Sequence, residues 1–595
     1  MGGVSSLQSA ADRCRPDQES LAIAPHMSLS LPHLATQVAL FDAWSRHRIA
    51  RFAPLVTLHL AAFAIAVATE TGVARIAMFI AAWGFVNFFW LVLLRRPGLS
   101  AVLSFPILVT LIAISRFKFD VLWTTASFVD VMIIDADTFA FFWMMFPTVR
   151  GAAEIAVVVA IPLAFVIWRV DPYRVRRVVS LLGAAACLGV IIVLGNLMTL
   201  AHGDSFGKRN YVSYFAHSGV HAIAAYWQQG YLESDKEVAD RLDTADECQP
   251  AGKRPHIILV HDEGSFDLLA VADAKVPQGY GGHFRSFDGK ARKLLVEGAG
   301  GPSWFTEYNV LSGLSVRSYG RFRFFVTRIA AGRVQRGLAS SLRHCGYHTH
   351  AIYPVSGGFL AARSFYTGTG FEHFIDGKEL GSGNFEPDRF YFDRASQLIA
   401  DEHLHGSLFL FVFLTANHFM WDYPFHEELT PADWSNPGNE MPEVNEYLRR
   451  QAMSERDFND FVARLKRDFP DESFLIVRYG DHQPDFAKHI IDPAIDAEER
   501  ARRLGRYDAR YYTSYYAIDA LNFRPVDLSM ALDVLDAPYL PLVVQGAAGL
   551  PLDPSFAEQR RILDRCQGLF YGCAGGAEAR RFNRLLINAG LIKGL

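Results

Sequence analysis

Three short apolar stretches of the chain are each followed by side chains that can bind a metal ion or an anion. They are Glu263 after residues 256–260, His418 after residues 407–415, and Asp481 with His482 after residues 473–479. Carboxyl ends of strands in an open α/β sheet meet at one edge, so we expect these side chains to gather there. Each alone could be a solvated acid, a turn or a loop histidine, but their joint placement favours a site.

A serine stands where a glycine-rich turn runs into a segment with helical spacing, in "EGAGGPSWFTEYNVLSGL" (297–314). The N-terminus of a helix has unpaired N–H groups and a partial positive charge, and it therefore suits an anionic phosphate. Ser303 is either a plain N-cap of this helix or a nucleophile presented to a phosphate. The glycines would let the backbone approach the phosphate closely, and Pro302 would stiffen the entry.

Glutamate, aspartate and histidine together suit a divalent ion such as Mn²⁺, Mg²⁺ or Zn²⁺. We expect one such ion at Glu263, Asp481 and His482, beside Ser303. It would lower the pKa of the serine hydroxyl and neutralise phosphoryl oxygens. The predicted chemistry is displacement at phosphorus through a covalent phospho-serine.

The elements that must position these residues alternate between apolar strands and amphipathic helices. The predicted strands are residues 256–260, 348–355, 407–415, 473–479 and 538–546, and the predicted helices are 333–347 and 454–469. Continuous apolar strands between helices indicate an α/β domain with a buried, mostly parallel sheet. We assign this domain to residues 256–595.

Residues 51–200 predict a transmembrane domain. Apolar runs cover residues 54–69, 76–94, 99–114, 152–168 and 178–200, each close to the length that a bilayer requires. Five such runs in succession favour five spans over buried globular helices. Residues 120–147 are aromatic and apolar but carry four aspartates, which are costly in hydrocarbon, so we expect an interfacial or re-entrant element there.

Lys and Arg in the short loops predict the orientation. The basic loop residues are Arg46, Arg48 and Arg51 before the first run, Arg95 and Arg96 between the second and third, and Arg169, Arg174, Arg176 and Arg177 between the fourth and fifth. Residues 1–50 would then be a cytoplasmic segment, with Met1 or Met27 as its start. Everything after about residue 201 would lie outside: residues 201–255 as membrane-surface helices, one at 213–232, and a linker, followed by the α/β domain.

Composition limits the function classes and the disulfide pattern. The net charge of the 595-residue chain is only −4, which gives nucleic-acid binding no electrostatic support. Four of its six cysteines, Cys248, Cys345, Cys566 and Cys573, would lie in an oxidising compartment. Residues 566–573 could close a short disulfide loop, but four cysteines allow three pairings, and two free thiols are an alternative.

The apolar runs and the segments "VHDEGSF", "GGPSWFTEYNVLSGL", "ANHF" and "RYGDHQP" resemble a known family. They look like the lipoteichoic acid synthase branch of the alkaline phosphatase/sulfatase superfamily, which includes phosphoglycerol and phosphoethanolamine transferases, over about residues 50–550. The resemblance implies a sulfatase-like domain with Ser303 as nucleophile, where the family usually has Thr. It also implies that Glu263, Ser303, Asp481 and His482 hold the metal and that His418 binds the substrate phosphate.

Two further substrate contacts are expected with this resemblance. Arg363, in "GGFLAARSFY", loosely matches the family's aromatic–Asn–Arg segment, and Trp304 directly follows the nucleophile. The chain lacks the cysteine-rich pattern of lipid A phosphoethanolamine transferases, which argues against that subgroup. It also lacks the proline of the sulfatase signature, which makes formylglycine chemistry unexpected.

The resemblance implies a transferase of the bacterial inner membrane with a periplasmic catalytic domain. It would move phosphoglycerol or phosphoethanolamine from a membrane phospholipid to a hydroxyl of a periplasmic glycan or lipid. An enzyme that meets both a lipid and a polar acceptor has a reason to be tethered to the membrane. The alternatives are a phosphodiesterase or phospholipase that uses water as acceptor, and a catalytically inactive lipid-binding sensor.

The basic loops predict that residues 201–595 lie outside the cytoplasmic membrane. A protease added to intact spheroplasts should therefore digest this part of the chain, as immunoblotting of its fragments would detect. A domain that is protected in spheroplasts but cut in inverted vesicles would overturn the predicted topology.

Overall fold

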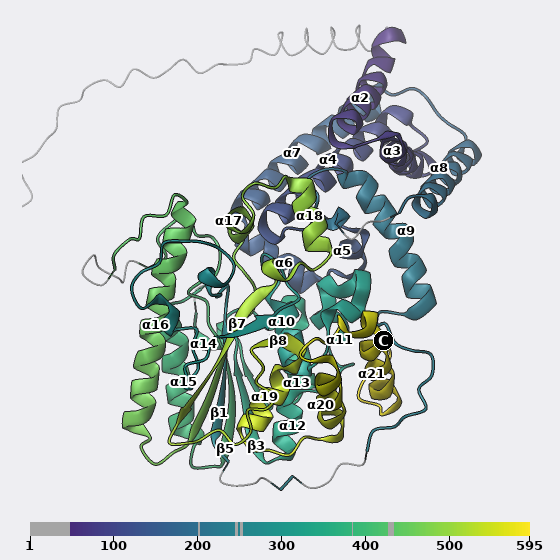
Figure 1. The fold of residues 1–595 in the computed structure, drawn as a ribbon. Helices are drawn as coiled ribbons and strands as arrows, with labels where there is room; N and C mark the ends of the chain where they lie inside the picture. The colour runs from purple at the N-terminus through teal and green to yellow at the C-terminus, as the bar shows by residue number, and fades with distance from the viewer. Residues whose placement is uncertain (1–47, 200–202, 244–247, 250–253, 383–384, 427–433) are drawn as a thin grey trace, which may run out of the picture.

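The computed structural model describes residues 48–595, except for residues 200–202, 244–247, 250–253, 383–384 and 427–433. The predicted cytoplasmic segment, with Cys14 and Met27, therefore lies almost wholly outside the described residues. The described chain forms a helical region followed by an α/β domain (Figure 1).

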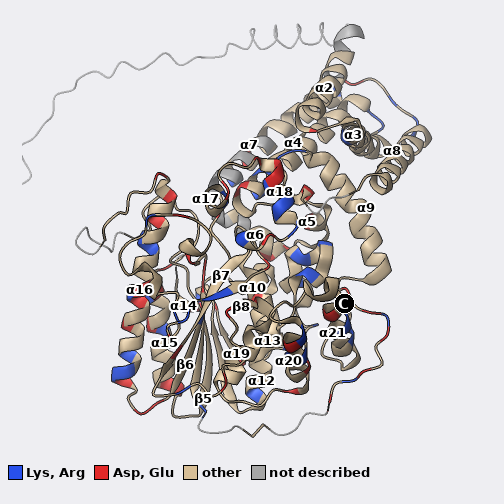
Figure 2. Ribbon diagram, viewed as in Figure 1, with Lys and Arg blue, Asp and Glu red and all other residues tan. Residues whose placement is uncertain are grey.

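Helices cover all five apolar runs of the helical region. They are α2 (Arg48–Thr69), α3 (Val73–Leu94), α4 (Pro97–Leu122), α7 (Pro147–Val170) and α8 (Arg177–Leu197). Among the described residues, α3, α4 and α8 are long and apolar enough to cross a membrane, and Leu55–Thr69 is a shorter apolar helix. Figure 2 shows α3 and α8 with almost no charged side chains. A membrane region is thus supported, and the number of five spans stays a prediction.

The aspartates of residues 120–147 have structural partners. This segment forms the end of α4 and two short helices, α5 (Phe128–Ile133) and α6 (Ala136–Met145). Asp130 accepts a 2.7 Å hydrogen bond from the N–H of Ser127 and an equally short one from Lys118. Asp135 pairs with Arg328 of the α/β domain at 3.0 Å. The segment therefore joins the two parts of the chain, because its carboxylates cap helices and form ion pairs.

Helix α9 (Tyr211–Gln229) matches the helix expected at residues 213–232 and packs against α3, α4 and α8. Its start is fixed by Glu70, whose carboxylate accepts hydrogen bonds from the N–H groups of Val212 (3.2 Å) and Ser213 (3.3 Å). From there α9 runs toward the α/β domain (Figure 1).

The α/β domain is built on an eight-stranded mixed sheet with the order β4-β3-β5-β1-β6-β7-β2-β8. The strands are β1 (His256–Asp262), β2 (Arg292–Leu295), β3 (Tyr347–Ile352), β4 (His373–Ile375), β5 (Ser407–Phe413), β6 (Phe474–Gly480), β7 (Thr513–Leu521) and β8 (Val534–Asp536). Strand β7 runs antiparallel to both of its neighbours, and the other pairs are parallel. The expected mostly parallel sheet is confirmed.

Helices cover both faces of the sheet, so its central strands are mostly apolar, with Arg478 in β6 as a buried exception. In β1, Ile257 and Leu259 join the core beneath α10 (Ser303–Ser312) and α12 (Leu338–His344), whereas Ile258 and Val260 face the opposite core. That second core is covered by α15 (Asp388–Glu402) and α16 (Pro442–Asp468). The two layers are seen on either side of the strands in Figure 1.

The prediction of a strand at residues 538–546 is wrong. Residues Ala537–Tyr539 form a 3-10 turn and Leu540–Ala547 form α19, which is buried all round. An apolar run of this length cannot be assigned to strand or buried helix from periodicity alone, and Pro541 fits the first turn of a helix. Four strands were missed, β2, β4, β7 and β8, of which β7 is the longest. Helix boundaries also differ, since α12 begins only at Leu338 and α16 already at Pro442.

The α/β domain contains two disulfide bonds among its described residues. Cys566 bonds to Cys573, which confirms the short loop suggested by the sequence, and Cys248 bonds to Cys345. The second bond ties the segment that leaves the helical region to the start of β3, across 97 residues of chain.

The two disulfides should differ in their effect on stability. Replacing Cys248 and Cys345 by Ser should lower the free energy of unfolding by about 4–5 kcal/mol, because a long loop is released in the unfolded chain. The same change at Cys566 and Cys573, 7 residues apart, should cost about 2–3 kcal/mol. Chemical denaturation of both double variants tests this order, and a larger loss for the short loop would contradict it.

Candidate active site

Ser303 is the first residue of α10, and its hydroxyl does not cap the helix. The capping position is Pro302, and no side-chain capping bond is formed there. The Ser303 Oγ lies 3.3 Å from His482 Nε2 and 3.5 Å from the carbonyl oxygen of Gly301. The plain N-cap interpretation is therefore wrong, because the hydroxyl lies against the end of β6.

Hydrogen bonds at both ends hold α10 in this position. Thr306 donates from Oγ1 to the carbonyl oxygen of Asp481 at 2.7 Å, which ties the first turn to the end of β6. The buried carboxylate of Glu297 accepts from Asn309 Nδ2 at 2.8 Å and from the N–H of Val316 at 2.6 Å. Glu297 thus links the loop before the helix to the segment after it.

The glycines before Ser303 were expected to allow a close approach of the backbone to a phosphate, but they contact another part of the chain. Gly300 and Gly301 have φ of 74° and 141°, which favour glycine. A Cβ on Gly300 would lie 2.3 Å from the ring of Trp123, at the end of α4. The glycines therefore let the loop pack against the helical region, which the sequence alone did not indicate.

Four of the predicted site residues come together around His482 Nε2. The nearest oxygens are Glu263 Oε1 at 3.1 Å, Asp481 Oδ2 at 3.4 Å and Ser303 Oγ at 3.3 Å. His261, which was not predicted, joins them: its Nε2 lies 3.3 Å from Asp481 Oδ2 and 3.7 Å from Glu263 Oε2. The carboxylates and both imidazoles are buried.

The remaining atoms of these side chains are used to orient them. Asp481 Oδ1 accepts hydrogen bonds from the N–H groups of Gly264 (2.8 Å) and His482 (2.9 Å). Nδ1 of His482 lies 3.0 Å from the carbonyl oxygen of Gln483, and Nδ1 of His261 lies 3.0 Å from the hydroxyl of Tyr479. These bonds direct Asp481 Oδ2 and both Nε2 atoms toward the shared space, as the hydrogen bonds that orient the ligands of a metal do.

The residues present fit a divalent cation. Within the described residues, His261 Nε2, Glu263 Oε2 and Asp481 Oδ2 are buried and have no hydrogen-bond partner. Buried polar atoms without a partner are costly, so their convergence requires a ligand. Atoms that bind a tetrahedral metal at about 2.0–2.2 Å lie about 3.3–3.6 Å from one another, which matches the separations here. Histidine and carboxylates together suit Zn²⁺ or Mn²⁺.

Electrostatics also indicate a missing positive charge. Burial alone would lower the pKa of His261, but Asp481 and Glu263 raise it to about 10. Burial would likewise lower the pKa of His482, but Asp481 and Glu263 raise it to about 9. Burial would raise the pKa of Glu263, but His261 and His482 hold it well below its usual range. Two imidazolium groups thus balance the carboxylates, and a bound cation would displace their protons.

His418 lies beside this cluster on the loop after β5. Burial lowers the pKa of His418, and Glu263 partly offsets this effect, so the ring is neutral at pH 7. Its Nδ1 lies 2.9 Å from the carbonyl oxygen of Phe419, and its ring stacks on Phe385. The fully buried Arg450 donates to the carbonyl oxygen of His418 at 2.7 Å and holds the loop in place. No pattern in the sequence indicated Arg450.

The two other predicted substrate contacts have structural partners. Arg363, on α13 (Ala362–Gly368), forms ion pairs with Asp376 at 2.9 Å and Glu379 at 2.7 Å. Among the described contacts none joins it to the cluster. Trp304 is 7% exposed, and its indole N–H donates to the carbonyl oxygen of Phe324 at 2.7 Å. Their roles toward a substrate stay predictions.

The sequence did contain a signal for His261. Side chains two residues apart on a strand point to the same face. A histidine two positions before Glu263, at the end of an apolar strand, was therefore a candidate for the same cluster.

Part of the α/β domain is similar to a known protein family. Residues 305–512 match the Sulfatase family model. These residues form a sulfatase-family domain. The superfamily expected from the sequence motifs is thus confirmed, and with it the dependence of such domains on a metal ion. No curated protein matches the chain.

Three solved structures are similar to the chain at low sequence identity. The lipoteichoic acid synthase LtaP of Listeria monocytogenes is 17% identical, with a TM-score of 0.38 over 50% of this chain and 73% of that one. The phosphoglycerol transferase GacH of Streptococcus pyogenes, in complex with sn-glycerol-1-phosphate, is 14% identical, with a TM-score of 0.42 over 57% and 87%. The lipooligosaccharide phosphoethanolamine transferase EptA of Neisseria meningitidis is 13% identical, with a TM-score of 0.35 over 68% and 82%.

Removal of a central ligand should abolish metal binding. We expect Asp481→Ala to reduce the metal content, measured by plasma mass spectrometry, from about one ion per chain to nearly none, because Asp481 Oδ2 contacts both histidines of the cluster. His261→Gln should weaken binding by about 10–100-fold. The exposed His405 serves as control, since His405→Gln should keep full occupancy. Full occupancy in Asp481→Ala would reject this metal site.

Proposed function

We propose that the protein is a metal-dependent transferase of the cell envelope. It moves a phospho-head group, phosphoglycerol or phosphoethanolamine, from a membrane phospholipid to a hydroxyl of a periplasmic glycan or lipid. The observation that carries this proposal is the Ser303 hydroxyl, 3.3 Å from His482 Nε2 at the edge of a buried cluster with unpartnered ligand atoms. A serine placed only to start a helix would need none of these groups.

The first half of the reaction transfers the head group to the protein. The Ser303 Oγ attacks phosphorus, a new O–P bond forms, and the bond from phosphorus to the diacylglycerol oxygen breaks. The hydroxyl proton is lost from Ser303, and the diacylglycerol oxygen gains a proton as it leaves. The N–H groups at the start of α10 stabilise the phosphoryl oxygens. Because Nδ1 of His418 donates to the carbonyl oxygen of Phe419, Nε2 of the neutral ring is a proton acceptor, and it can orient a phosphoryl oxygen only after it has taken up a proton.

In the second half, a hydroxyl of the acceptor attacks the phospho-serine from the side that diacylglycerol has left. The acceptor loses its proton, and Ser303 regains one when its O–P bond breaks. His418 has a pKa lowered by burial and is therefore unprotonated and able to accept this proton. Glu263, Asp481, His482 and His261 would hold the cation, which supplies charge stabilisation to the phosphoryl group when bound.

The same site would also carry out the first rival reaction, in which water replaces the acceptor. Product analysis separates the two: a transferase yields a phosphorylated acceptor, whereas a phosphodiesterase yields only the free head-group phosphate. The second rival, an inactive sensor, would release no diacylglycerol at all. Mass spectrometry of the adduct on Ser303 would identify the head group from its added mass.

Replacement of the serine tests the mechanism directly. Ser303→Ala should fold and bind metal nearly normally, but release of diacylglycerol from a fluorescent phospholipid should fall by several orders of magnitude, because the nucleophile is gone. The melting temperature should change little, since the hydroxyl makes no capping bond. Ser303→Thr should keep partial activity. Release by Ser303→Ala at a rate near that of the wild type would refute the mechanism.

A further inference from the structure

A cavity of about 670 Å³ lies between the helical region and the sulfatase-family domain. Its walls come from the end of α4 and the segment before α5, from α9, from the 3-10 segment η4 (Val316–Phe325) and from residues 505–512. The cluster around His482 does not line it. Ala299, Pro302 and Phe305 do, so one wall is the back of the loop that presents Ser303.

The described lining of the cavity carries excess positive charge. Five basic residues line it, Lys118, Arg317, Arg321, Arg323 and Arg506, against the two acidic residues Glu233 and Glu297. Lys118 is already paired with Asp130 at 2.7 Å, so the excess comes from the four arginines. Each of the two acids is already hydrogen bonded: Glu297 to Asn309 and to the N–H of Val316, and Glu233 to the hydroxyl of Tyr571. Among the described contacts neither carboxylate forms an ion pair with an arginine of η4, and the two acids are outnumbered by the four arginines of the lining.

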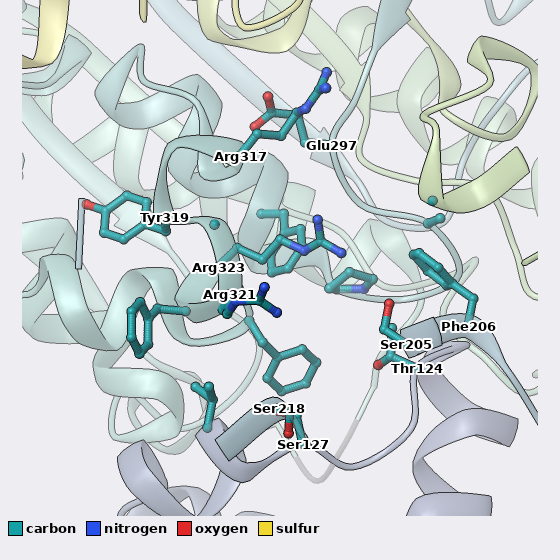
Figure 3. Close-up of a pocket in the computed structure, with 18 of the residues that line it drawn as sticks. Thr124, Ser127, Ser205, Phe206, Ser218, Glu297, Arg317, Tyr319, Arg321 and Arg323 are labelled. Carbon is teal, nitrogen blue, oxygen red and sulfur yellow. The ribbon is translucent and has the colours of Figure 1, made fainter. Parts of the chain in front are cut away.

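Two of the three arginines of η4 have neutral partners. Arg323 donates to the hydroxyl of Tyr507 at 2.6 Å, and Arg317 stacks on the rings of Tyr507 and Tyr571. The Nε of Arg317 is buried without a hydrogen-bond partner, and no ion pair joins any of the three to a described carboxylate. Figure 3 shows Arg321 and Arg323 among the side chains that line the cavity.

Hydroxyl groups face these arginines from the opposite wall. Figure 3 shows Thr124 and Ser205 across the cavity from Arg323. The Oγ1 of Thr124 is buried and has no described hydrogen-bond partner. Guanidinium groups whose partners are neutral, opposed by hydroxyl donors, form a site for a phosphate group, because arginine binds phosphate oxygens through several N–H groups at once.

We propose that this cavity binds a phosphate group at a second site, separate from the catalytic cluster. The ligand is a phosphomonoester or phosphodiester, carried either by a lipid, whose tails would lie along α4 and α9, or by a free molecule. Because Pro302 and Phe305 form part of the wall, the bound ligand lies directly behind the loop of Ser303. The proposal does not require that the protein be a transferase.

Binding can be measured without catalysis. Purified full-length protein is titrated by calorimetry with dihexanoyl phosphatidylglycerol, glycerol phosphate, inorganic phosphate and, as phosphate-free control, dihexanoylglycerol. The titrations are made with the wild type and with Asp481→Ala, in which the catalytic cluster is disrupted. A phosphate ligand that still binds to Asp481→Ala occupies a second site. Failure of the proposed transferase activity would leave this result unchanged.

The arginines are then replaced on both backgrounds. Arg321→Gln with Arg323→Gln should raise the Kd of the phosphate ligand by about tenfold or more, because charge-assisted hydrogen bonds are lost. Arg524→Gln, an exposed arginine at the far end of β7, should leave it unchanged. If the melting curve shows that the double variant is unfolded, the single variant Arg321→Gln, at an exposed position, is used instead. It should raise the Kd of the phosphate ligand severalfold.

Each outcome has one meaning. Binding of the lipid alone identifies a lipid phosphate as the ligand, and binding of glycerol phosphate or inorganic phosphate as well identifies a free phosphate. The proposal is overturned if no phosphate ligand binds to Asp481→Ala, if dihexanoylglycerol binds equally well, or if the glutamine variants bind with unchanged affinity.

Discussion

Much of the structure depends on one constraint, the burial of carboxylates at the ends of two adjacent parallel strands. Strands β1 and β6 pair in register, with Asp262 opposite Gly480, so Glu263 and Asp481 leave the sheet side by side. Two carboxylates in a buried position require a positive charge between them. His261 and His482 supply part of it, and the atoms that still lack partners point to a cation.

The nucleophile is positioned by this constraint rather than by its own loop. Thr306 binds the backbone of Asp481, so the first turn of α10 is fixed to the same strand end that carries the ligands. The loop before it is fixed by Glu297 and by the contact of Gly300 with Trp123. A movement of α4 would therefore act on the loop of Ser303 directly. This contact gives the helical region a structural part in the site beyond anchoring.

The arrangement also explains how two polar sites can exist close to a membrane. The catalytic cluster lies at the sheet edge, whereas the arginine-lined cavity lies on the other side of the nucleophile loop, between α4 and α9. Asp130 and Asp135, two of the four aspartates of residues 120–147, are occupied by caps and by ion pairs with Lys118 and Arg328. These two acids form no ion pair with the arginines of η4 among the described contacts.

The sequence by itself determined the class of the domain, its central strands and the residues at their ends. Strands β1, β3, β5 and β6 were predictable because a parallel strand covered on both faces must be apolar throughout. Glu263, Asp481 and His482 were predictable because parallel strands end at one edge. Only the tertiary structure decided that residues 540–547 are a helix and that β7 is a strand, since short apolar segments fit either form. It also brought in His261, Arg450 and the Trp123–Gly300 contact, because packing between segments distant in the chain leaves no periodic trace in the sequence.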